Sequence, residues 1–375
     1  MDKELLNIIV KFYVSEYNEG PGVMVQRSPE WFANMVYTCG GSCMSVVMGA
    51  NKYKSVEQLI ADKIKLAKGE EVFIANPATI FGTMFESVAE LIISKDLDNP
   101  IYGTDITINN KFKGVRYSPD GIIVSKVDEQ YCICLVEIKS PLNRVPVEDK
   151  IPIEYYHQMQ LGLASIPICE YGLFVDCQFR KCNLDALEQE SGCNYPSPPY
   201  DIIYHKNKYG RFTTPSNEYH ARGFILLATP NEKIDLHIRK GWKSEKWQPG
   251  DNALNLDVNY FYEAHTTKGY MDAGNVSPDT FDLILTLINN KQILNINSKI
   301  YSNSELLSED VIYSDIHKIE LPENYNILGF IPYKLVEFVK KIITKEDNYI
   351  DIALPKITEV INKVRDGLAN CKSDE

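Results

Sequence analysis

The stretch GVRYSPDGIIVSKVDEQYCICLVEIKSP, residues 114–141, decides the expected fold. Its apolar residues and its central polar turn at 128–129 predict a β-hairpin of two largely buried strands. Antiparallel pairing about that turn places Asp120 opposite Glu137. Side chains alternate along a strand, so Lys139 lies on the same face as Glu137. Two carboxylates and an ammonium are therefore expected to meet at one end of the hairpin.

Such a group of charges is costly to bury unless it binds a partner such as a metal ion. Carboxylates that hold Mg²⁺, with Mn²⁺ as a substitute and an ammonium alongside, suit hydrolysis of a phosphodiester. The carbonyl of Ile138 is a further candidate metal ligand, and Lys139 would orient or deprotonate the attacking water. The alternative is that Asp120 only forms the SPDG turn, and that Glu137 and Lys139 are charges of an edge strand.

Length and composition limit the number of domains and the class of protein. The 375 residues allow two domains, or one domain with a large insertion. Apolar residues at 44% and charged residues at 24% are typical of a soluble globular protein, and the net charge of −12 disfavours a DNA coat held by overall attraction. The N-terminal MDKELLNIIVKFY is unlike a signal peptide and no segment has the length of a membrane span, so we expect an intracellular protein.

Cysteine usage favours reduced thiols. The chain has nine cysteines, an odd number, and Cys132 and Cys134 lie two apart in an expected strand, where they cannot easily bridge. Cys177, Cys182 and Cys193 raise the question of a zinc site. They lack a CxxC pair and a nearby histidine at ligand spacing, so this interpretation is disfavoured.

Periodicity and capping signals predict helices before and after the hairpin. The order of the elements predicts an α/β fold with a mixed central sheet flanked by helices. The expected helices are 3–17, the segment from Ser28 and Pro29 onward, two runs within 38–64, 78–95 and 153–166, and the expected strands are 106–112, 117–125, 131–140, 169–178 and 221–230.

Three regions are predicted along the chain. Residues 1–185 form the core, and residues 186–325, which begin with a segment rich in Pro, Ser, Asn and Tyr, form an insertion or second subdomain. Residues 326–375 are expected to close the fold with two amphipathic helices, 328–345 and 352–368, that pack on the core.

Asp120 followed by Glu137-Ile138-Lys139 resembles the PD-(D/E)xK nuclease signature. The blocks QRSPEW, FGTMFE, SPDG, VEIKSP and YYHQMQ, in this order over about residues 26–180, resemble the lambda-exonuclease branch, the YqaJ-type recombination nucleases of phages and large DNA viruses. The resemblance implies a restriction-endonuclease-like core and a Mg²⁺-dependent exonuclease that degrades linear double-stranded DNA from 5′ to 3′ in recombination, replication or repair. It also implies ring-shaped trimers and a strand-annealing partner protein, in the host cytoplasm or nucleus for a viral protein.

The resemblance assigns two further residues to the catalytic site. Glu86 falls opposite the apolar stripe of its helix, so periodicity alone makes it a solvated glutamate. The family's G-x-x-x-E helix, here Gly82 to Glu86, supplies an acidic residue to the metal site. Gln158 lies off the apolar stripe of its helix, and the resemblance makes it the glutamine that positions the water or the scissile phosphate.

The resemblance also implies a pocket for the terminal 5′-phosphate of DNA. The family's Trp and Ser correspond to Trp31 and to Ser42, which follows two glycines at an expected helix N-terminus where backbone N–H groups can bind an anion. The family's Arg is replaced by Met35, and Arg27 or Lys52 is expected to compensate.

A basic segment lies late in the chain, and two other functions remain open. Residues 237–247, HIRKGWKSEKW, interleave cations with Trp242 and Trp247, which suits DNA contact but also an ordinary solvated surface. The first rival function is an endonuclease or RNA-cleaving nuclease on the same core. The second is a catalytically silent DNA-binding scaffold, which the retained acidic residues and lysine disfavour.

Overall fold

The computed structural model describes most of the first 182 residues and separate segments of the remainder. The described residues are 2–19, 24, 28–70, 76–104, 107–108, 111–142, 144–147, 150–182, 184, 187, 221–230, 266–267, 270–274, 276, 278–289, 291, 293–301, 305 and 307–373. The predicted roles of Arg27 and of the basic segment 237–247 therefore lie outside the described residues.

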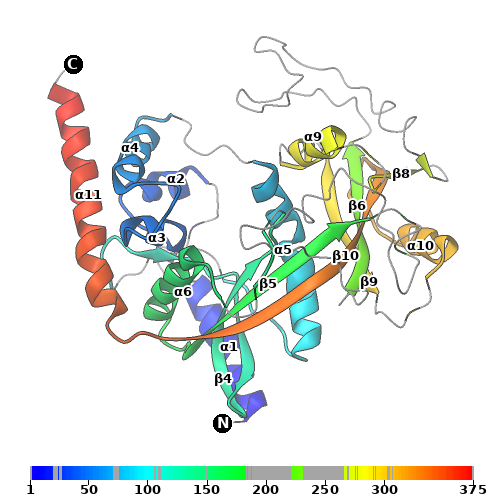
Figure 1. Cartoon of the computed structure of the whole chain (residues 1–375), viewed down its shortest axis with the longest axis horizontal. Coiled ribbons are helices and arrows are strands. Elements are labelled where there is room, and N and C mark those ends of the chain that lie inside the picture. The colour runs from blue at the N-terminus through cyan, green and yellow to red at the C-terminus, as the bar shows by residue number, and fades with distance from the viewer. Residues whose placement is uncertain are drawn as a thin grey trace.

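A mixed sheet with the strand order β3-β4-β5-β10-β6-β9 forms the centre of the molecule. Strands β4 and β5 are parallel, whereas the other neighbours along this path are antiparallel. Figure 1 shows β5 and β10 running side by side through the middle of the molecule. The strands are β3 (Gly121–Val127), β4 (Gln130–Lys139), β5 (Tyr171–Lys181), β6 (Ala221–Pro230), β9 (Leu294–Tyr301) and β10 (Tyr325–Thr344), with β7 (Thr266–Thr267) and β8 (Tyr270–Asp272) attached to β10 and a separate pair β1 (Thr107–Ile108) and β2 (Arg116–Tyr117).

Helices cover both faces of this sheet, and the predicted α/β class is confirmed. Helices α5 and α9 contribute to the apolar core on one face, and α1, α6 and α11 contribute to the core on the other. No helix within the described residues is long and apolar enough to cross a membrane. The helices are α1 (Lys3–Asn18), α2 (Pro29–Val36), the 3₁₀ turn η1 (Gly41–Cys43), α3 (Met44–Val47), α4 (Val56–Ala67), α5 (Pro77–Asp96), α6 (Ile153–Ser165), α9 (Pro278–Asn289), α10 (Glu309–Ile316) and α11 (Tyr349–Ser373).

The β3–β4 hairpin has the register expected from the sequence. Gly121 pairs with Val136, so the next position outward sets Asp120 against Glu137. The turn residues Asp128 and Glu129 both have positive φ angles, 47° and 64°. Two such residues form the tight turn whose twist matches that of the flanking strands. The turn thereby fixes which side chains share each face of the hairpin.

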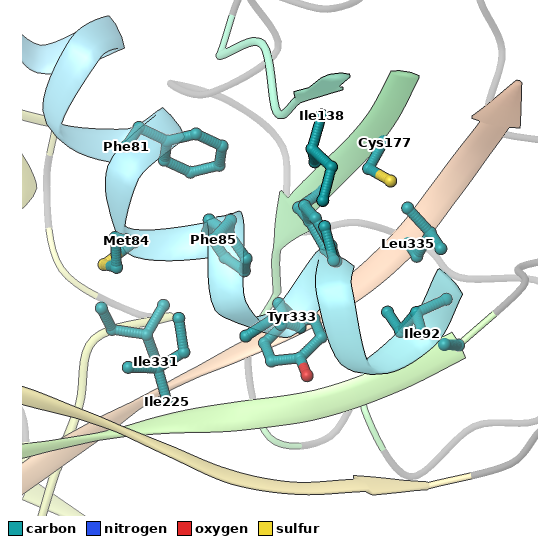
Figure 2. Close-up of a cluster of buried hydrophobic side chains, with 14 of the residues drawn as sticks. Phe81, Met84, Phe85, Ile92, Ile138, Cys177, Ile225, Ile331, Tyr333 and Leu335 are labelled. Carbon is teal, nitrogen blue, oxygen red and sulfur yellow. The ribbon is translucent and has the colours of Figure 1, made fainter. Parts of the chain in front are cut away.

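Helix α5 is anchored across the sheet by large apolar side chains. Phe81 and Phe85 of this helix point onto β4, β5 and β10, and the Phe85 ring stacks on Phe179 with 4.4 Å between centroids (Figure 2). Burial of each such side chain contributes roughly 1.5–3 kcal/mol to folding. The predicted apolar stripe is buried except for Leu91, which is 54% exposed. This packing holds the opposite, more polar stripe of α5 near the end of β4.

The sequence prediction for residues 328–345 is wrong. They are predicted as an amphipathic helix, but they lie in β10, a single strand of 20 residues. Strand β10 pairs with β6 along its first half and with β5 along its second half. Residues 328–336 are all buried, so they have no solvent face that could distinguish a helix period from a strand period. Pro332, inside this run, is unfavourable within a helix and was the signal against one.

The second predicted closing helix is confirmed as α11, which buries Ala353, Ile357, Val360, Ile361 and Val364 against the core. Strands β6 and β9 come from the predicted insertion, and β10 joins them to β5 in the same sheet. The division into 1–185, 186–325 and 326–375 stays a prediction.

Candidate active site

Asp120, Glu137 and Lys139 meet at the end of the hairpin, as the register predicts. The Lys139 ammonium contacts Oε1 of Glu137 and lies 3.8 Å from Oδ2 of Asp120. Asp120 is held in place because Oδ2 accepts a hydrogen bond of 2.6 Å from the backbone N–H of Ile138. The ammonium of Lys139 therefore forms ion pairs with two carboxylates.

Glu137 is fully buried and each of its oxygens has a partner. Oε1 accepts a hydrogen bond of 2.6 Å from the Gln158 amide on α6, and Oε2 accepts one of 3.3 Å from the Tyr117 hydroxyl on β2. Although Gln158 lies off the apolar stripe of its helix, its side chain is half-buried and points to the carboxylate, so it is not an exposed surface amide.

Two glycines allow Tyr117 to reach Glu137. A Cβ atom on Gly162 would lie 2.4 Å from the Tyr117 ring, and one on Gly41 would lie 2.7 Å from it. The backbones of α6 and η1 therefore close on the ring from two sides. The sequence analysis missed Tyr117, although its place three residues before Asp120 is a signal that was available.

Burial dominates the electrostatics of the site. Desolvation raises the pKa of Glu137 to about 7, Asp120 adds to this increase, and Lys139 opposes it. Burial acts to lower the pKa of Lys139, but Glu137 and Asp120 outweigh this effect and raise it well above the ordinary value. The site therefore holds two carboxyl groups beside one ammonium, and the raised pKa of Glu137 reflects this surplus of acid in a buried place.

Helix α5 presents a polar stripe to the same region. A Cβ atom on Gly82 would lie 3.6 Å from the carbonyl oxygen of Ser140, the residue after β4. Two turns later, burial and then Asp120 raise the pKa of Glu90. Glu86 is half-buried and lies one turn from each of these residues, between them on the helix. The sequence analysis missed Glu90, although it repeats the four-residue spacing from Glu86.

The donor atoms fit a magnesium ion. Mg²⁺ prefers oxygen ligands, takes one or two carboxylates and keeps several waters. Asp120 and Glu137 supply two carboxylates beside a single ammonium, and Oδ1 of Asp120 has no partner among the described residues. No group of three or more His, Cys, Asp or Glu side chains that could hold a metal occurs among the described residues.

A second acid–base pair lies on the neighbouring strand. Asp176 of β5 pairs in register with Lys139 of β4, but its carboxylate binds both terminal nitrogens of Arg144, one of them at 2.6 Å. The ring of Tyr155 lies 5.2 Å from the Lys139 ammonium and 5.6 Å from the Arg144 guanidinium. No pattern in the loop around Arg144 predicts this pairing.

Trp31 of the predicted phosphate pocket lies beside an arginine that the sequence analysis missed. The Arg116 guanidinium, from β2, lies 5.0 Å from the Trp31 ring. Ser42 is exposed within η1, a turn too short to build the predicted helix N-terminus. Lys52 is exposed in the loop between α3 and α4, and no described contact joins it to Trp31 or Ser42.

The cysteines in the described residues are free thiols at positions 39, 43, 132, 134, 169, 177 and 182. Cys177 and Cys182 are buried, and Cys193 of the disfavoured zinc interpretation lies outside the described residues.

Residues 30–166, which run from α2 to the end of α6 and carry Asp120, Glu137, Lys139 and Gln158, match the model of the YqaJ-like viral recombinase domain. This segment is therefore similar to the YqaJ-like viral recombinase domain. The resemblance predicted from the five sequence blocks is thereby confirmed.

Similar proteins occur in African swine fever virus. A protein from a South African tick isolate is 30% identical over 201 residues, covering 48% of this chain and 57% of the relative. A protein from a Malawian tick isolate is 30% identical over 184 residues, covering 43% and 52%. The chain thus spans about half the length of the curated relatives that it matches.

Two solved structures also show similarity to this chain. One is the crystal structure of LHK-Exo in complex with dAMP, with 24% identity, a TM-score of 0.32, and coverage of 40% of this chain and 73% of that one. The other is an alkaline exonuclease, LHK-Exo, from Laribacter hongkongensis, with 23% identity, the same TM-score, and coverage of 40% and 74%.

Proposed function

We propose that this protein is a Mg²⁺-dependent exonuclease that hydrolyses phosphodiester bonds of linear double-stranded DNA from the 5′ end. The observation that carries the proposal is a pair of carboxylates, half-buried Asp120 and fully buried Glu137, that share one ammonium within a segment similar to the YqaJ-like domain. The surplus carboxyl must take up a proton or bind a further cation, and phosphodiester hydrolysis commonly uses a divalent ion in this place.

Asp120 and Glu137 would hold the ion, together with the Ile138 carbonyl and Glu86. When bound, Mg²⁺ supplies positive charge to the phosphate and makes a nearby water more acidic. Lys139 would stabilise charge that develops on the phosphate, because its raised pKa keeps it protonated. A raised pKa keeps the Lys139 amine protonated, so it disfavours the predicted role of Lys139 as a base and favours its role in orienting the water.

Gln158 would act as a positioning residue. Its amide donates to Oε1 of Glu137, the same oxygen that Lys139 contacts, and so fixes the direction of the remaining lone pairs. Tyr117 fixes Oε2 in the same way. Because both donors are neutral, they orient the carboxylate without cancelling the charge that binds the cation.

The proposed process is the handling of viral or phage DNA. The similarity to the YqaJ-like domain favours a role in DNA recombination, replication or repair for a virus or phage. For a viral protein, the compartment would be the host cytoplasm or nucleus. A strand-annealing partner and a ring-shaped trimer follow only from the resemblance of the motifs to the lambda-exonuclease branch.

Digestion of end-labelled linear duplex beside a covalently closed circle tests the proposal. We expect Mg²⁺-dependent loss of the linear DNA, release of a 5′ label before a 3′ label, and no cutting of the circle. Mn²⁺ should substitute, and EDTA should stop the reaction.

Each other result has a definite meaning. Cutting of the closed circle would establish an endonuclease, and digestion of RNA in preference to DNA would establish an RNA-cleaving nuclease. Metal-independent binding of DNA without cleavage would establish the scaffold function and refute the proposal.

A further inference from the structure

Two cysteines lie at the ends of the sequence CGGSC, residues 39–43, which runs from a bridge with Val115 into the turn η1. Cys39 is fully buried, and its backbone is held on both sides. Its N–H donates to the carbonyl of Gly114 at 2.7 Å, and its carbonyl accepts from the N–H of Arg116 at 3.1 Å. Cys43 is half-buried, so it is the member of the pair that solvent can reach.

The side chains of Cys39 and Cys43 contact each other through a hydrogen bond. In its protonated form the Cys43 thiol also donates to the carbonyl oxygen of Gly40 at 3.1 Å, and the backbone N–H of Cys43 donates to the same oxygen at 3.1 Å. These contacts fold the Cys43 side chain back over the two glycines toward Cys39. Two thiols that already touch across a short turn meet the first geometric requirement for a disulfide.

Two buried cations flank the cysteine pair. The Lys63 ammonium donates to the carbonyl oxygen of Thr38, the residue before Cys39, at 2.7 Å. On the other side, a Cβ atom on Gly40 would lie 3.2 Å from Nε of Arg116. Neither cation forms an ion pair with a carboxylate of the described residues. Their positive charge therefore acts on the thiols.

The two thiols differ in reactivity. The hydrogen bond from Cys39, and then the charges of Lys63 and Arg116, lower the pKa of the Cys43 thiol to about 6, although burial opposes this change. The same hydrogen bond, together with burial, raises the pKa of Cys39 well above its ordinary value. The thiolate is the nucleophilic form of cysteine, so Cys43 is the reactive member of the pair. Burial raises the pKa of other described thiols, those of Cys132, Cys134, Cys169 and Cys177.

The turn η1 touches both neutral donors of Glu137. A Cβ atom on Gly41 would lie 2.7 Å from Cγ of Gln158 and 2.7 Å from the ring of Tyr117. These two side chains donate to the two oxygens of the Glu137 carboxylate. Helix α3, which follows η1 directly, lies beside α6 (Figure 1). A displacement of η1 would therefore change the orientation of Glu137.

We propose that Cys39 and Cys43 are a redox-active dithiol, which hydrogen peroxide converts to an intramolecular disulfide that slows the candidate active site. A covalent bond brings two sulfur atoms closer together than a hydrogen bond does. Because the backbone of Cys39 is fixed, the bond draws η1 toward it, and Gly41 moves relative to Gln158 and Tyr117. The effect on cleavage rests on the proposed exonuclease function, whereas formation of the disulfide does not.

The reaction has two steps. The Cys43 thiolate attacks one oxygen of hydrogen peroxide, the O–O bond breaks, and a sulfenic acid forms while the departing hydroxide takes a proton from solvent. The Cys39 thiol then attacks the Cys43 sulfur, the S–S bond forms, and the S–OH group leaves as water with the proton of Cys39. Two thiols are oxidised to one disulfide, and one peroxide is reduced to two waters. A dithiol reductant reverses the change by thiol–disulfide exchange.

Peptide mass measures the disulfide directly. Trypsin releases residues 28–52 as one peptide, which contains Cys39 and Cys43 and no other cysteine. After brief treatment of the full-length protein with hydrogen peroxide and alkylation of the remaining thiols, this peptide should have lost two hydrogen atoms and should carry no alkyl group. Dithiothreitol before alkylation should restore two alkylated thiols. A peptide that stays fully alkylated after peroxide would overturn the proposal.

The rate of DNA digestion measures the consequence. Once catalase has removed the peroxide, the oxidised protein should digest linear duplex about tenfold more slowly or less, as for disturbance of the groups that orient a metal ligand. Dithiothreitol should restore the rate. An unchanged rate in protein that carries the disulfide, or a loss that dithiothreitol does not reverse, would refute the proposed control of the active site.

Three serine variants assign the two roles. Cys43→Ser and Cys39→Ser should each keep their untreated rate after peroxide. Dimedone, which labels sulfenic acids, should label position 43 in Cys39→Ser, because no second thiol resolves the acid, and should not label position 39 in Cys43→Ser. Cys132→Ser is the matched control, since it removes a buried thiol of β4 and should remain as sensitive to peroxide as the wild type.

Two results separate this inference from the proposed function. Protein that forms the disulfide but digests no DNA, reduced or oxidised, would keep the dithiol and refute the exonuclease. Digestion of DNA that peroxide slows equally in the wild type and in Cys43→Ser would keep the exonuclease and refute the dithiol.

Discussion

The neighbouring strands β4 and β5 each carry a buried acid–base group, and the two groups differ in charge balance. On β5, Asp176 binds one guanidinium, that of Arg144, through two hydrogen bonds, so the pair is neutral. On β4, Lys139 serves both Glu137 and Asp120, so an excess negative charge remains. A balanced pair is satisfied within the protein, whereas the second acid of an unbalanced group must take up a proton or bind a further cation. The difference separates a structural ion pair from a candidate metal site.

The largest effect is expected from Glu137→Gln, which keeps the shape of the side chain and removes its charge. Hydrolysis of linear duplex should fall by about 10³-fold or more, as for loss of a preorganised electrostatic group. In EDTA the variant should be as stable as the wild type or more stable, since it removes an unbalanced buried charge. Initial cleavage rates and thermal unfolding measure the two effects.

Asp98→Asn is the control for Glu137→Gln. Asp98 is fully exposed and has a φ angle of 47°, which asparagine tolerates, so neither activity nor stability should change. A marked loss of stability in Glu137→Gln, with cleavage retained, would place Glu137 in the same structural class as Asp176.

Arg144→Met should act in the opposite way, on stability first. It leaves Asp176, 2% exposed, without its counter-ion. We expect the free energy of unfolding to fall by about 2–3 kcal/mol, less than for a fully buried pair because Arg144 is partly exposed. Urea unfolding measures this change. The double variant with Asp176→Leu should recover most of the loss, and no recovery would show that the pair does more than balance charge.

Gln158→Leu sharpens the comparison within the β4 group. Loss of the amide donor to Glu137 should lower kcat roughly tenfold with a smaller change in KM, since the amide orients a ligand and does not bind DNA directly. Steady-state kinetics at saturating Mg²⁺ separates the two constants. Gln158→Glu, which places another acid against Glu137, should be more harmful than Gln158→Leu. A rise in KM alone would instead make Gln158 a DNA contact.

The smallest effect is expected from Gly82→Ala. The added Cβ would lie 3.6 Å from the Ser140 carbonyl, an ordinary contact, and alanine favours helix by about 0.5–1 kcal/mol over glycine. Stability should rise by that amount, and cleavage should fall a few-fold if DNA passes over this point of α5. Thr83→Ala, an exposed position on the next residue, is the control for helix propensity. A stable and fully active Gly82→Ala would exclude a close approach of the substrate there.

Local patterns predicted most of the elements near the site. The cap at Ser28 predicts the helix that follows it, the apolar periodicity of α5 predicts that helix, and the hairpin turn defines its own register. These signals depend only on residues that are neighbours in the chain, so they can be recognised before the fold is known. Strand β10 lacks such a signal because it is buried between β5 and β6, and the partners that make it a strand are between 95 (Pro230 to Tyr325) and 173 (Tyr171 to Thr344) positions away in the sequence.

Asp120, Glu137 and Lys139 meet for a reason that can be read from residues 114–141 alone, because a short hairpin with a tight turn permits one register. The sequence also determined the YqaJ-like resemblance through the order of its motifs. Only the tertiary structure decided which cations have protein partners. Arg144 and Arg116 look alike in the sequence, but Asp176 of β5 reaches the first, whereas the second lies against the Trp31 ring and Gly40 with no carboxylate partner among the described residues. Charge balance in a buried site depends on residues brought together from distant parts of the chain, and no local pattern encodes it.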